Sequence, residues 1–138
     1  MWKCEQVIGG ALDVEEAAAL YRASTLAERR PVEDTRRFTR MLAGANLVIV
    51  ARDEDGRLIG ISRSITDGAY ATYLSDLAVD GAYQGKGVGR DLIRATREAA
   101  PQANLILLAA PAARDYYPHL GFTAHNSAWT MNGPAHQA

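Results

Sequence analysis

The chain has 138 residues, of which 48% are hydrophobic and 22% are charged. This composition is typical of one folded domain and excludes a disordered, collagen-like or coiled-coil chain. Fifteen basic and sixteen acidic side chains leave a formal net charge of -1, so the chain has no overall positive field that would attract a nucleic acid or an anionic membrane. Any attraction for an anion must therefore be local.

Cysteine and histidine usage argues against a metal or disulfide site. Cys4 is the only cysteine, which excludes an intrachain disulfide and a cysteine-rich metal centre. The spacings of His119, His125 and His136 match no zinc pattern. Residues 1–5 lack the apolar core of a signal peptide, and no segment reaches the roughly 18 continuous apolar residues of a membrane span. We expect a cytoplasmic protein without a metal.

The first third of the chain predicts a short strand and two helices. A strand is expected over 5–8. Asp13 resembles an N-cap with Glu16 three residues later, a capping-box arrangement that begins a helix running to about residue 25. The run 29–31, Arg-Arg-Pro, ends that helix, and a second helix is expected over 32–43.

The middle of the chain changes to a strand pattern. Apolar and β-branched runs predict strands over 47–51, 58–65 and 70–79, joined by turns that contain Gly56 and Gly68. Because these turns are short, the three strands should be antiparallel neighbours.

The last part of the chain alternates helices and strands. A helix is expected over 91–100, a buried strand over 105–108, a short helix over 111–120 and a final strand over 122–131. A strand followed by a helix and another strand implies a parallel neighbour in an otherwise antiparallel sheet. The sequence therefore predicts a mixed α/β fold in one domain over residues 1–138.

Three alternating glycines stand where a strand is followed by a helix. Gly85, Gly87 and Gly89 would let backbone N–H groups approach a ligand closely, and the helix that follows adds its partly positive N-terminus. Lys86 and Arg90 supply local positive charge, so the turn is suited to phosphate oxygens. The spacing matches neither a P-loop nor a dinucleotide fingerprint. The alternative is a tight turn without a ligand.

These residues resemble a known family. Leu77-Ala78-Val79-Asp80, followed by residues 83–89 (Tyr-Gln-Gly-Lys-Gly-Val-Gly), is similar to the acetyl-coenzyme A signature of the GNAT N-acetyltransferase superfamily. Residues 113–122 are similar to the Ala-x-x-Phe-Tyr-x-x-Leu-Gly-Phe segment of that family. The stretch Arg30-Pro31 and the segments 63–70 and 75–79 are also similar to plant chloroplast enzymes described as serotonin N-acetyltransferases and protein lysine acetyltransferases. Ala110 departs from the pattern, since many members carry Asn there, which weakens one expected hydrogen bond.

The resemblance covers nearly the whole chain and implies the GNAT acyltransferase fold, a mostly antiparallel sheet flanked by helices. It implies that the backbone of Leu77, Ala78 and Val79 pairs with the pantetheine arm of acetyl-coenzyme A as an added strand would. It further implies that the pyrophosphate is held by the turn that contains Gln84, Gly85, Lys86, Gly87, Val88, Gly89 and Arg90.

Two side chains are candidates for acid and base chemistry. A lysine-like amine has a pKa near 10.4 and is mostly protonated at neutral pH, so a base or a water relay is needed. Asp76 matches an acidic position frequent in the family and is the candidate base; the alternative is that it orients a loop or faces solvent. Tyr117 aligns with the tyrosine acid of the family, in contact with the cofactor, and would protonate the leaving thiolate. Tyr116 aligns with a packing aromatic. An N–H near Val79 is the expected oxyanion donor.

The acceptor stays open at this stage. The family implies an arylalkylamine, a polyamine-like amine or a protein lysine, with segments 21–31 and 70–73 lining the acceptor side. It also implies direct attack in a ternary complex, since no sequence pattern supports a covalent route through Cys4. A homodimer is a candidate assembly, with the uncharged segment 116–138 as a contact surface. The alternatives are a non-catalytic coenzyme A-binding module and a nucleotide hydrolase.

Overall fold

The computed structural model describes residues 1–134. Its strands and helices follow one another as β1 (Trp2–Val7), α1 (Val14–Ala23), α2 (Thr35–Gly44), β2 (Leu47–Asp53), β3 (Leu58–Thr66), β4 (Ala71–Val79), α3 (Val88–Ala99) and β5 (Asn104–Ile106). Short 3-10 turns lie at η1 (Gly9–Ala11), η2 (Leu26–Arg29), η3 (Gly81–Tyr83), η4 (Pro111–Ala113) and η5 (Tyr117–Leu120).

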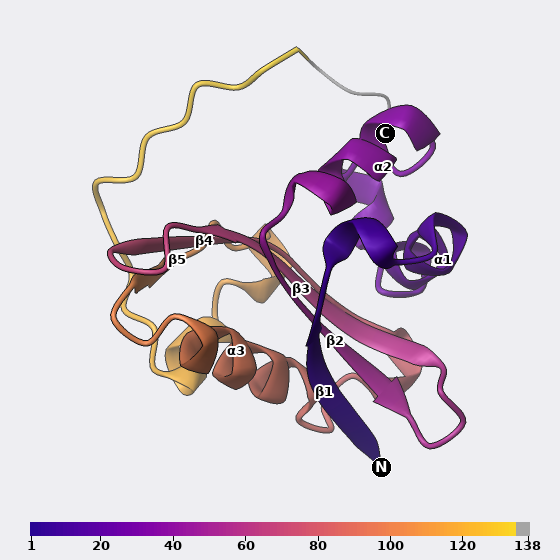
Figure 1. The fold of residues 1–138 in the computed structure, drawn as a ribbon. Helices are drawn as coiled ribbons and strands as arrows, with labels where there is room; N and C mark the ends of the chain where they lie inside the picture. The colour runs from indigo at the N-terminus through magenta and orange to yellow at the C-terminus, as the bar shows by residue number, and fades with distance from the viewer. Residues whose placement is uncertain (135–138) are drawn as a thin grey trace.

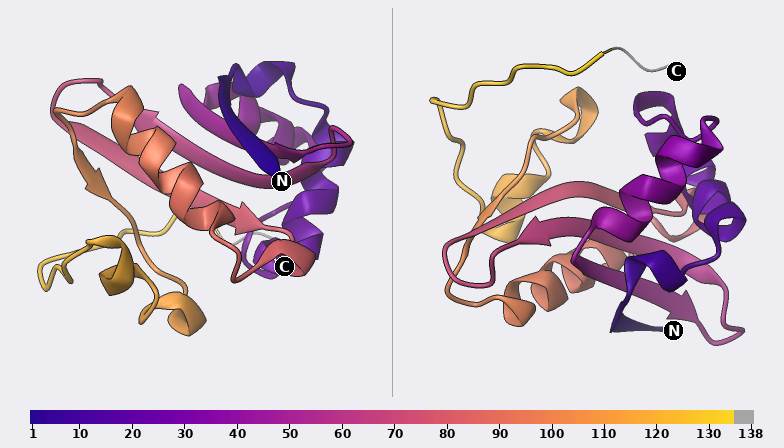
Figure 2. Two further views of the ribbon diagram at one scale, coloured as in Figure 1. Left: turned by 90° about the horizontal axis from the view of Figure 1, so that it is seen from below. Right: turned by 45° about the horizontal axis from the view of Figure 1, so that its top comes forward.

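The five strands form one sheet in the order β1-β2-β3-β4-β5. The first four are antiparallel to their neighbours, whereas β4 and β5 are parallel. Helices α1 and α2 cover one face of the sheet, and α3 covers the other (Figures 1 and 2). The mixed, mostly antiparallel sheet flanked by helices that the sequence predicts is confirmed. Among residues 1–134, no helix is long and apolar enough to cross a membrane.

The pairing of β4 is irregular on both of its sides. Toward β3 the register passes from Arg63↔Asp76 to Ser64↔Leu74, which leaves Ser75 as an extra residue in a β-bulge. Toward β5 the ladder covers only three pairs and ends at Tyr73. The second half of β4 therefore presents an edge that no strand of residues 1–134 lies beside.

Side-chain caps set the starts of both N-terminal helices. The Asp13 carboxylate accepts a hydrogen bond from the backbone N–H of Glu16 at 3.1 Å, so the expected N-cap is present. The Glu16 side chain does not complete a capping box, because it binds Arg52 on β2 at 2.9 Å and 3.0 Å. Helix α2 begins at Thr35 rather than at residue 32, since Asp34 is its N-cap and accepts from the N–H of Arg37.

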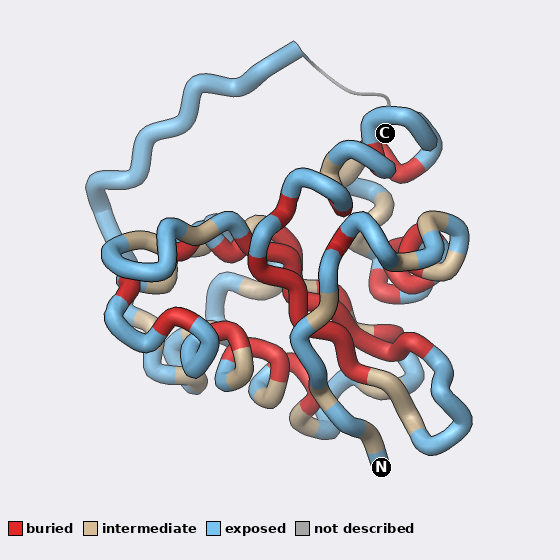
Figure 3. Tube along the Cα trace, in the orientation of Figure 1, coloured by how far each residue is buried: buried red, intermediate tan, exposed pale blue. Residues whose placement is uncertain are grey.

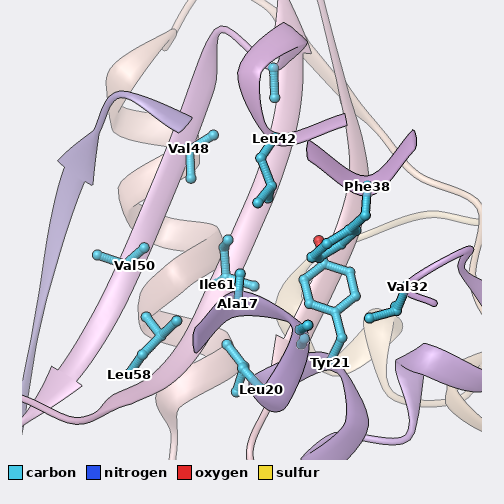
Figure 4. Close-up of a cluster of buried hydrophobic side chains, with 13 residues drawn as sticks. Ala17, Leu20, Tyr21, Val32, Phe38, Leu42, Val48, Val50, Leu58 and Ile61 are labelled. Atoms are coloured by element: carbon cyan, nitrogen blue, oxygen red, sulfur yellow. The ribbon is translucent and has the colours of Figure 1, made fainter. Parts of the chain in front are cut away.

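The core consists of two apolar clusters, one on each face of the sheet. Between the sheet and helices α1 and α2, Tyr21 and Phe38 meet edge to face with ring centroids 4.9 Å apart (Figure 4). On the opposite face, Val88 and Leu92 of α3 pack against Ile59 and other strand residues. The burial of both faces fixes the strand register, because a shift by one residue would turn the apolar side chains outward.

The N-terminal strand is longer than the sequence predicts. It begins at Trp2 rather than at residue 5 and pairs with β2 along its whole length. The ring N–H of Trp2 also donates to the Asp91 carboxylate of α3 at 2.9 Å. These long-range contacts extend the strand beyond the apolar segment that defined it in the sequence.

The prediction of a final strand over 122–131 is wrong for the structure as described. These residues adopt no regular structure, and the chain arcs away from the body as an exposed coil (Figures 1 and 3). Trp129 and Met131 are 93% and 99% exposed. Alternating apolar residues favour a strand, but a strand also needs a hydrogen-bonding partner along its edge, and this segment has none among residues 1–134.

Two neighbouring expectations also need correction. The strand predicted over 105–108 is shorter and less buried, since β5 ends at Ile106, and Ile106 and Leu108 are half exposed. The helix predicted over 111–120 is replaced by the two separate 3-10 turns η4 and η5. The second turn ends at Gly121, whose φ of 92° is a left-handed conformation that favours glycine.

Gly60 allows α3 to lie close to the sheet, and this contact can be tested. A Cβ at Gly60 would lie 2.9 Å from side-chain carbons of both Val88 and Leu92. Gly60→Ala should therefore lower the free energy of unfolding by about 1–3 kcal/mol, a typical effect of overpacking, as measured by urea denaturation. Gly44→Ala is the matched control, because nothing lies within 4 Å of its Cβ position at the end of α2; it should be neutral or stabilising. Equal stability of the two variants would contradict the close packing.

Candidate active site

A cleft of about 990 Å³ lies where β4 and the chain after β5 diverge. Its walls are the free half of β4, the segment after β5, the glycine-rich turn with the start of α3, and the turn after α1. The residues that line the cleft include Thr25, Arg29, Arg30, Tyr73, Ser75, Leu77, Val79, Gln84, Gly85, Gly87, Val88, Gly89, Arg90, Ala110, Tyr116 and Tyr117.

The edge of β4 forms one wall of this cleft. The side chains of Leu77 and Val79 line it, while Ala78 points to the opposite face of the sheet and is buried in the α1/α2 cluster. The side-chain amide of Gln84 donates to the carbonyl oxygen of Val79 at 3.0 Å. Because the β5 ladder ends at Tyr73, the backbone of this wall is not engaged by a strand on its cleft side.

The glycine-rich turn closes one end of the cleft. Gly85 and Gly87 have φ values of 78° and 103°, which a residue with a Cβ rarely adopts. Gly87 is the N-cap of α3, so the turn leads directly into the first N–H groups of the helix, which lack intrahelical partners. Arg90 lines the cleft with this turn. Lys86 is not among the lining residues, and its ammonium nitrogen lies 5.8 Å from the centre of the Tyr83 ring.

Both tyrosines of the 113–122 segment lie in the cleft. Tyr117 packs edge to face against Phe122 and Tyr116, and burial, followed by its neighbour Tyr116, raises the pKa of its hydroxyl. The hydroxyl therefore stays protonated at neutral pH and can donate a proton. The prediction that Tyr116 is a core residue needs correction: it is 41% exposed and lines the cleft.

Tyr116 contacts the start of α3 at one point. A Cβ at Gly89 would lie 2.6 Å from the Tyr116 hydroxyl oxygen. Glycine at this helical position thus makes room for a side chain from a segment far along the chain. The sequence pattern alone gives the glycine spacing but does not show which side chain uses the space.

Asp76 lies behind the cleft wall, in a buried cluster of polar side chains. Its carboxylate accepts hydrogen bonds from Nε of Arg30 and Nε of Arg63, each at 2.6 Å, and from the Tyr21 hydroxyl at 2.7 Å. The Asp76 side chain is fully buried and is not among the residues that line the cleft. These bonds connect α1, the segment after η2, β3 and β4 through one carboxylate.

The electrostatics of this cluster oppose the base role that the sequence suggests. Burial by itself would raise the pKa of Asp76, but the charge and hydrogen bond of Arg63 and the charge of Arg30 outweigh it, and the pKa is lowered. Both oxygens already accept charged hydrogen bonds. A carboxylate in this state is a weak proton acceptor, and its side chain does not line the cleft.

Residues of the turn after α1 form the other end of the cleft. Thr25 has φ of 72°, the one non-glycine residue among residues 1–134 with a left-handed conformation. Arg29 and Arg30 follow it and line the cleft beside Tyr73 and Ser75. The family resemblance implies that this turn lies on the acceptor side, but the sequence pattern assigns its arginines no contact of their own; the two adjacent arginines before Pro31 are the signal that marks them.

The described chain offers no alternative metal or thiol centre. Within residues 1–134 no three His, Cys, Asp or Glu side chains are grouped so as to hold a metal ion, and His136 lies outside the described residues. Cys4 is half-buried on β1, away from the cleft, and burial followed by the charge of Asp91 raises the pKa of its thiol. A raised pKa makes this thiol a poor nucleophile.

Solved structures share this architecture. A GNAT-family acetyltransferase of Streptococcus pneumoniae superposes with a TM-score of 0.70 at 19% identity, covering 96% of this chain and 100% of its own. An aminoglycoside acetyltransferase from an uncultured soil metagenomic sample superposes with a TM-score of 0.70 at 21% identity. The superposition covers 97% of this chain and 96% of that chain. Glucosamine-6-phosphate N-acetyltransferase of Arabidopsis thaliana superposes with a TM-score of 0.65 at 14% identity, covering 96% of this chain and 98% of its own. The fold is that of the acetyltransferases.

Sequence comparison gives the family. The model of the acetyltransferase (GNAT) domain matches residues 17–138, so the chain belongs to the GNAT acetyltransferases, as its motifs predict. GCN5-related N-acetyltransferase 2, chloroplastic, of Arabidopsis thaliana is 34% identical over 76 residues, which cover 53% of this chain and 30% of that protein. Histone acetyltransferase TAP1 of Glycine max is 36% identical over 75 residues, or 52% and 32%. The match thus spans about a third of these relatives.

The contact between Gly89 and Tyr116 predicts that the effect of Gly89→Ala on stability changes sign when Tyr116 is also replaced. Gly89→Ala should lower the melting temperature, because its Cβ would meet the Tyr116 hydroxyl. In the Tyr116→Phe background the nearest remaining ring atom is 3.7 Å away, an ordinary contact. There Gly89→Ala should be neutral or stabilising by up to about 1 kcal/mol, the helix preference of alanine. Equal effects in both backgrounds would contradict this packing.

The Asp76 cluster predicts a specific loss of stability in acid. Because the pKa of Asp76 is lowered in the folded state, its contribution is present above the unfolded value of about 3.9 and is lost as the pH falls through the folded value. Asp76→Asn should lower the free energy of unfolding at pH 7 by about 3–5 kcal/mol, since two arginines lose their charged partner. It should also make the free energy of unfolding fall less steeply as the pH is lowered below about 4. Asp55→Asn, in an exposed turn, should change neither; denaturant unfolding between pH 2 and 7 measures both.

Proposed function

We propose that this chain transfers an acetyl group from acetyl-coenzyme A to a primary amine, by direct attack in a ternary complex. The observation that carries the proposal is the free edge of β4 that ends in the glycine-rich turn. A backbone edge of this kind can hydrogen-bond to the amides of an extended pantetheine arm as it would to another strand. The open space around Gly85 and the charge of Arg90 suit the pyrophosphate.

In this proposal two walls of the cleft bind different parts of acetyl-coenzyme A. Leu77, Ala78 and Val79 bind the pantetheine arm through their backbone, and the turn from Gln84 to Arg90, with Lys86 at its rim, binds the phosphates. The cleft volume lies near the upper end of the usual range for ligand sites, roughly 300–1,000 Å³. Ala110 also lines the cleft, where its methyl group contributes no hydrogen bond.

The reaction needs a neutral amine, a stabilised oxyanion and a proton for the thiolate. The amine nitrogen attacks the thioester carbonyl, so that a C–N bond forms and the C–S bond breaks. A backbone N–H of β4 near Val79 stabilises the oxyanion. Tyr117 donates its hydroxyl proton to the departing sulfur, a role that its neutral, partly buried hydroxyl suits. Solvent water takes the proton that the amine loses and returns one to Tyr117.

We assign Asp76 a positioning role in place of the base role suggested by its sequence neighbourhood. Its carboxylate holds Arg30, and Arg30 in turn donates to the carbonyl oxygen of Ser75 at 2.8 Å on the cleft wall. The carboxylate thereby fixes the turn after η2 against β4 at the bulge. This arrangement would set the width of the cleft at its acceptor end.

A non-catalytic coenzyme A-binding module is the second candidate. It would use the same β4 edge and glycine-rich turn, and the partial match to its enzymatic relatives leaves it open to test. We further propose that residues 1–138 form one domain and assemble as a homodimer. The cytoplasm is the proposed compartment, with the chloroplast, named for the Arabidopsis relative, as the alternative.

Tyr117→Phe should separate the enzyme from the binding module. If Tyr117 is the proton donor, kcat for thiol release should fall by about 100-fold or more, while the Kd of coenzyme A changes little. Tyr70→Phe is the matched control. The expectation that segment 70–73 lines the acceptor side holds for Tyr73 but not for Tyr70, which is 73% exposed and does not line the cleft, so the variant should keep full activity.

Three results would overturn the role of Tyr117 or the acetyltransferase function. Unchanged turnover in Tyr117→Phe would remove Tyr117 as the acid. Calorimetric binding of coenzyme A without turnover of any amine by the unmodified protein would favour the binding module, whereas binding of ATP with magnesium but not of coenzyme A would favour a nucleotide hydrolase.

A further inference from the structure

The charges that line the cleft all have one sign. Arg29, Arg30 and Arg90 are its charged lining residues, and no Asp or Glu from residues 1–134 is among them. Arg90 belongs to the glycine-rich turn, in which Gln84 donates to the carbonyl oxygen of Val79, whereas Arg30 donates to that of Ser75. Ser75 lies four residues before Val79 on β4, so these two points on the strand are about 13 Å apart at roughly 3.3 Å per residue. The cleft therefore has a second cationic end that the phosphates do not occupy.

The guanidinium of Arg30 is fixed but its charge is only partly neutralised. It donates to Asp76, to the carbonyl oxygen of Ser75 and to that of Arg29. Asp76 shares its single negative charge between Arg30 and Arg63. The cluster of two arginines and one carboxylate thus keeps one net positive charge directly behind the cleft wall.

Arg29 adds a second positive charge, and this one is accessible. It is exposed, and no carboxylate of residues 1–134 lies within ion-pair distance of its guanidinium. Its backbone carbonyl is held by Arg30, which anchors the residue at the cleft. Thr25, in a left-handed conformation at the start of this turn, lines the same end of the cleft. A guanidinium placed in this way can bind a carboxylate or phosphate through two parallel hydrogen bonds.

We propose, building on the acetyltransferase function above, that the acceptor is an amine that also carries a negatively charged group, such as an amino acid or an amino sugar phosphate. Its anionic group binds Arg29 at the Arg30 end of the cleft, and its nitrogen faces the thioester. Polyamines and lysine-rich peptides are poor acceptors, because their additional positive charges meet two arginines and no carboxylate.

The same charges assist the chemistry of the acceptor nitrogen. An anionic group beside an amine raises the amine pKa, because it stabilises the ammonium form. Pairing of that group with Arg29 cancels this effect, and the cationic surroundings favour the neutral amine. The nitrogen then attacks the thioester carbonyl, the C–S bond breaks, the thiolate takes the Tyr117 proton, and the amine proton leaves to water. No lining carboxylate is needed for this step.

Matched pairs of acceptors test the proposal. Thiol release from acetyl-coenzyme A would be measured with an amino acid and its amide, with an amino sugar phosphate and the unphosphorylated sugar, and with spermidine and a lysine peptide. The acid-bearing member of at least one pair should have a kcat/KM about tenfold or more above its neutral partner, the scale of one charged hydrogen bond. The pair that shows the difference in kcat/KM identifies whether the anionic group that the cleft binds is a carboxylate or a phosphate.

Arg29→Gln removes the accessible charge without touching the buried cluster. It should lower kcat/KM for the acid-bearing acceptor by about tenfold, leave its neutral partner within about twofold, and leave the Kd of coenzyme A unchanged. Arg29→Lys should restore part of the loss. Arg36→Gln is the control, since Arg36 is an exposed arginine on α2 that lines a separate surface hollow; it should affect neither acceptor.

Three outcomes would overturn the proposal. The first is a kcat/KM for a neutral amine, spermidine or a lysine peptide that matches or exceeds that of every acid-bearing acceptor. The second is an equal effect of Arg29→Gln on kcat/KM for both members of a pair. The third is that no acid-bearing amine is turned over and that the coenzyme A-loaded protein binds an N-acetyl amino acid and its amide with equal calorimetric affinity. Failure of the unmodified protein to bind coenzyme A would instead reject the acetyltransferase function, and the acceptor proposal with it.

Discussion

The divergence of β4 from β5 is the constraint on which the rest of the structure depends. The parallel ladder ends at Tyr73, and the six residues of β4 that follow keep a partner on one side only. A free backbone edge inside a protein is costly unless water or a ligand satisfies it. This edge is kept open by the bulge at Ser75 and by the direction of the chain after β5, and every residue of the proposed site is arranged around it.

The buried carboxylate of Asp76 stabilises one side of that opening. It joins Tyr21, Arg30 and Arg63, residues from three separate segments, on the face of β4 turned away from the cleft. Burial of a carboxylate is unfavourable by itself, and two guanidinium groups with good geometry offset the cost. The result is a positively charged cluster behind the wall, which supplies part of the field in the cleft.

The small net charge of the chain conceals this local arrangement. Sixteen acidic side chains balance fifteen basic ones over the whole molecule, yet within residues 1–134 the charged side chains that line the cleft are all arginines. One group of positive charge lies at the start of α3, where phosphates are proposed to bind, and the other at the turn after α1. An acetyl donor and an acceptor that are both anionic would each find one cationic end.

Local patterns in the sequence determined much of this protein. Hairpin turns gave the three antiparallel strands, Asp13 gave the start of α1, and the glycines at 85, 87 and 89 gave the strand-to-helix turn and the family. These features depend on neighbours within a few residues, so they can be interpreted without the fold. The extent of β1 and the absence of a strand over 122–131 depended on whether a distant partner was available, which no local pattern contains.

The tertiary structure alone decided the surroundings of individual side chains. Asp76 directly precedes a cofactor-binding signature in the sequence, but the alternation of β4 turns its carboxylate to the opposite face, where Arg30 and Arg63 bind it. Tyr116 matches a packing position, but its hydroxyl lies at Gly89. Arg29 and Arg30 reach the acceptor end because the chain after α1 crosses the cleft. The sequence therefore determined the class of chemistry, and long-range packing decided which side chains face it, because charge and contact depend on distance in space.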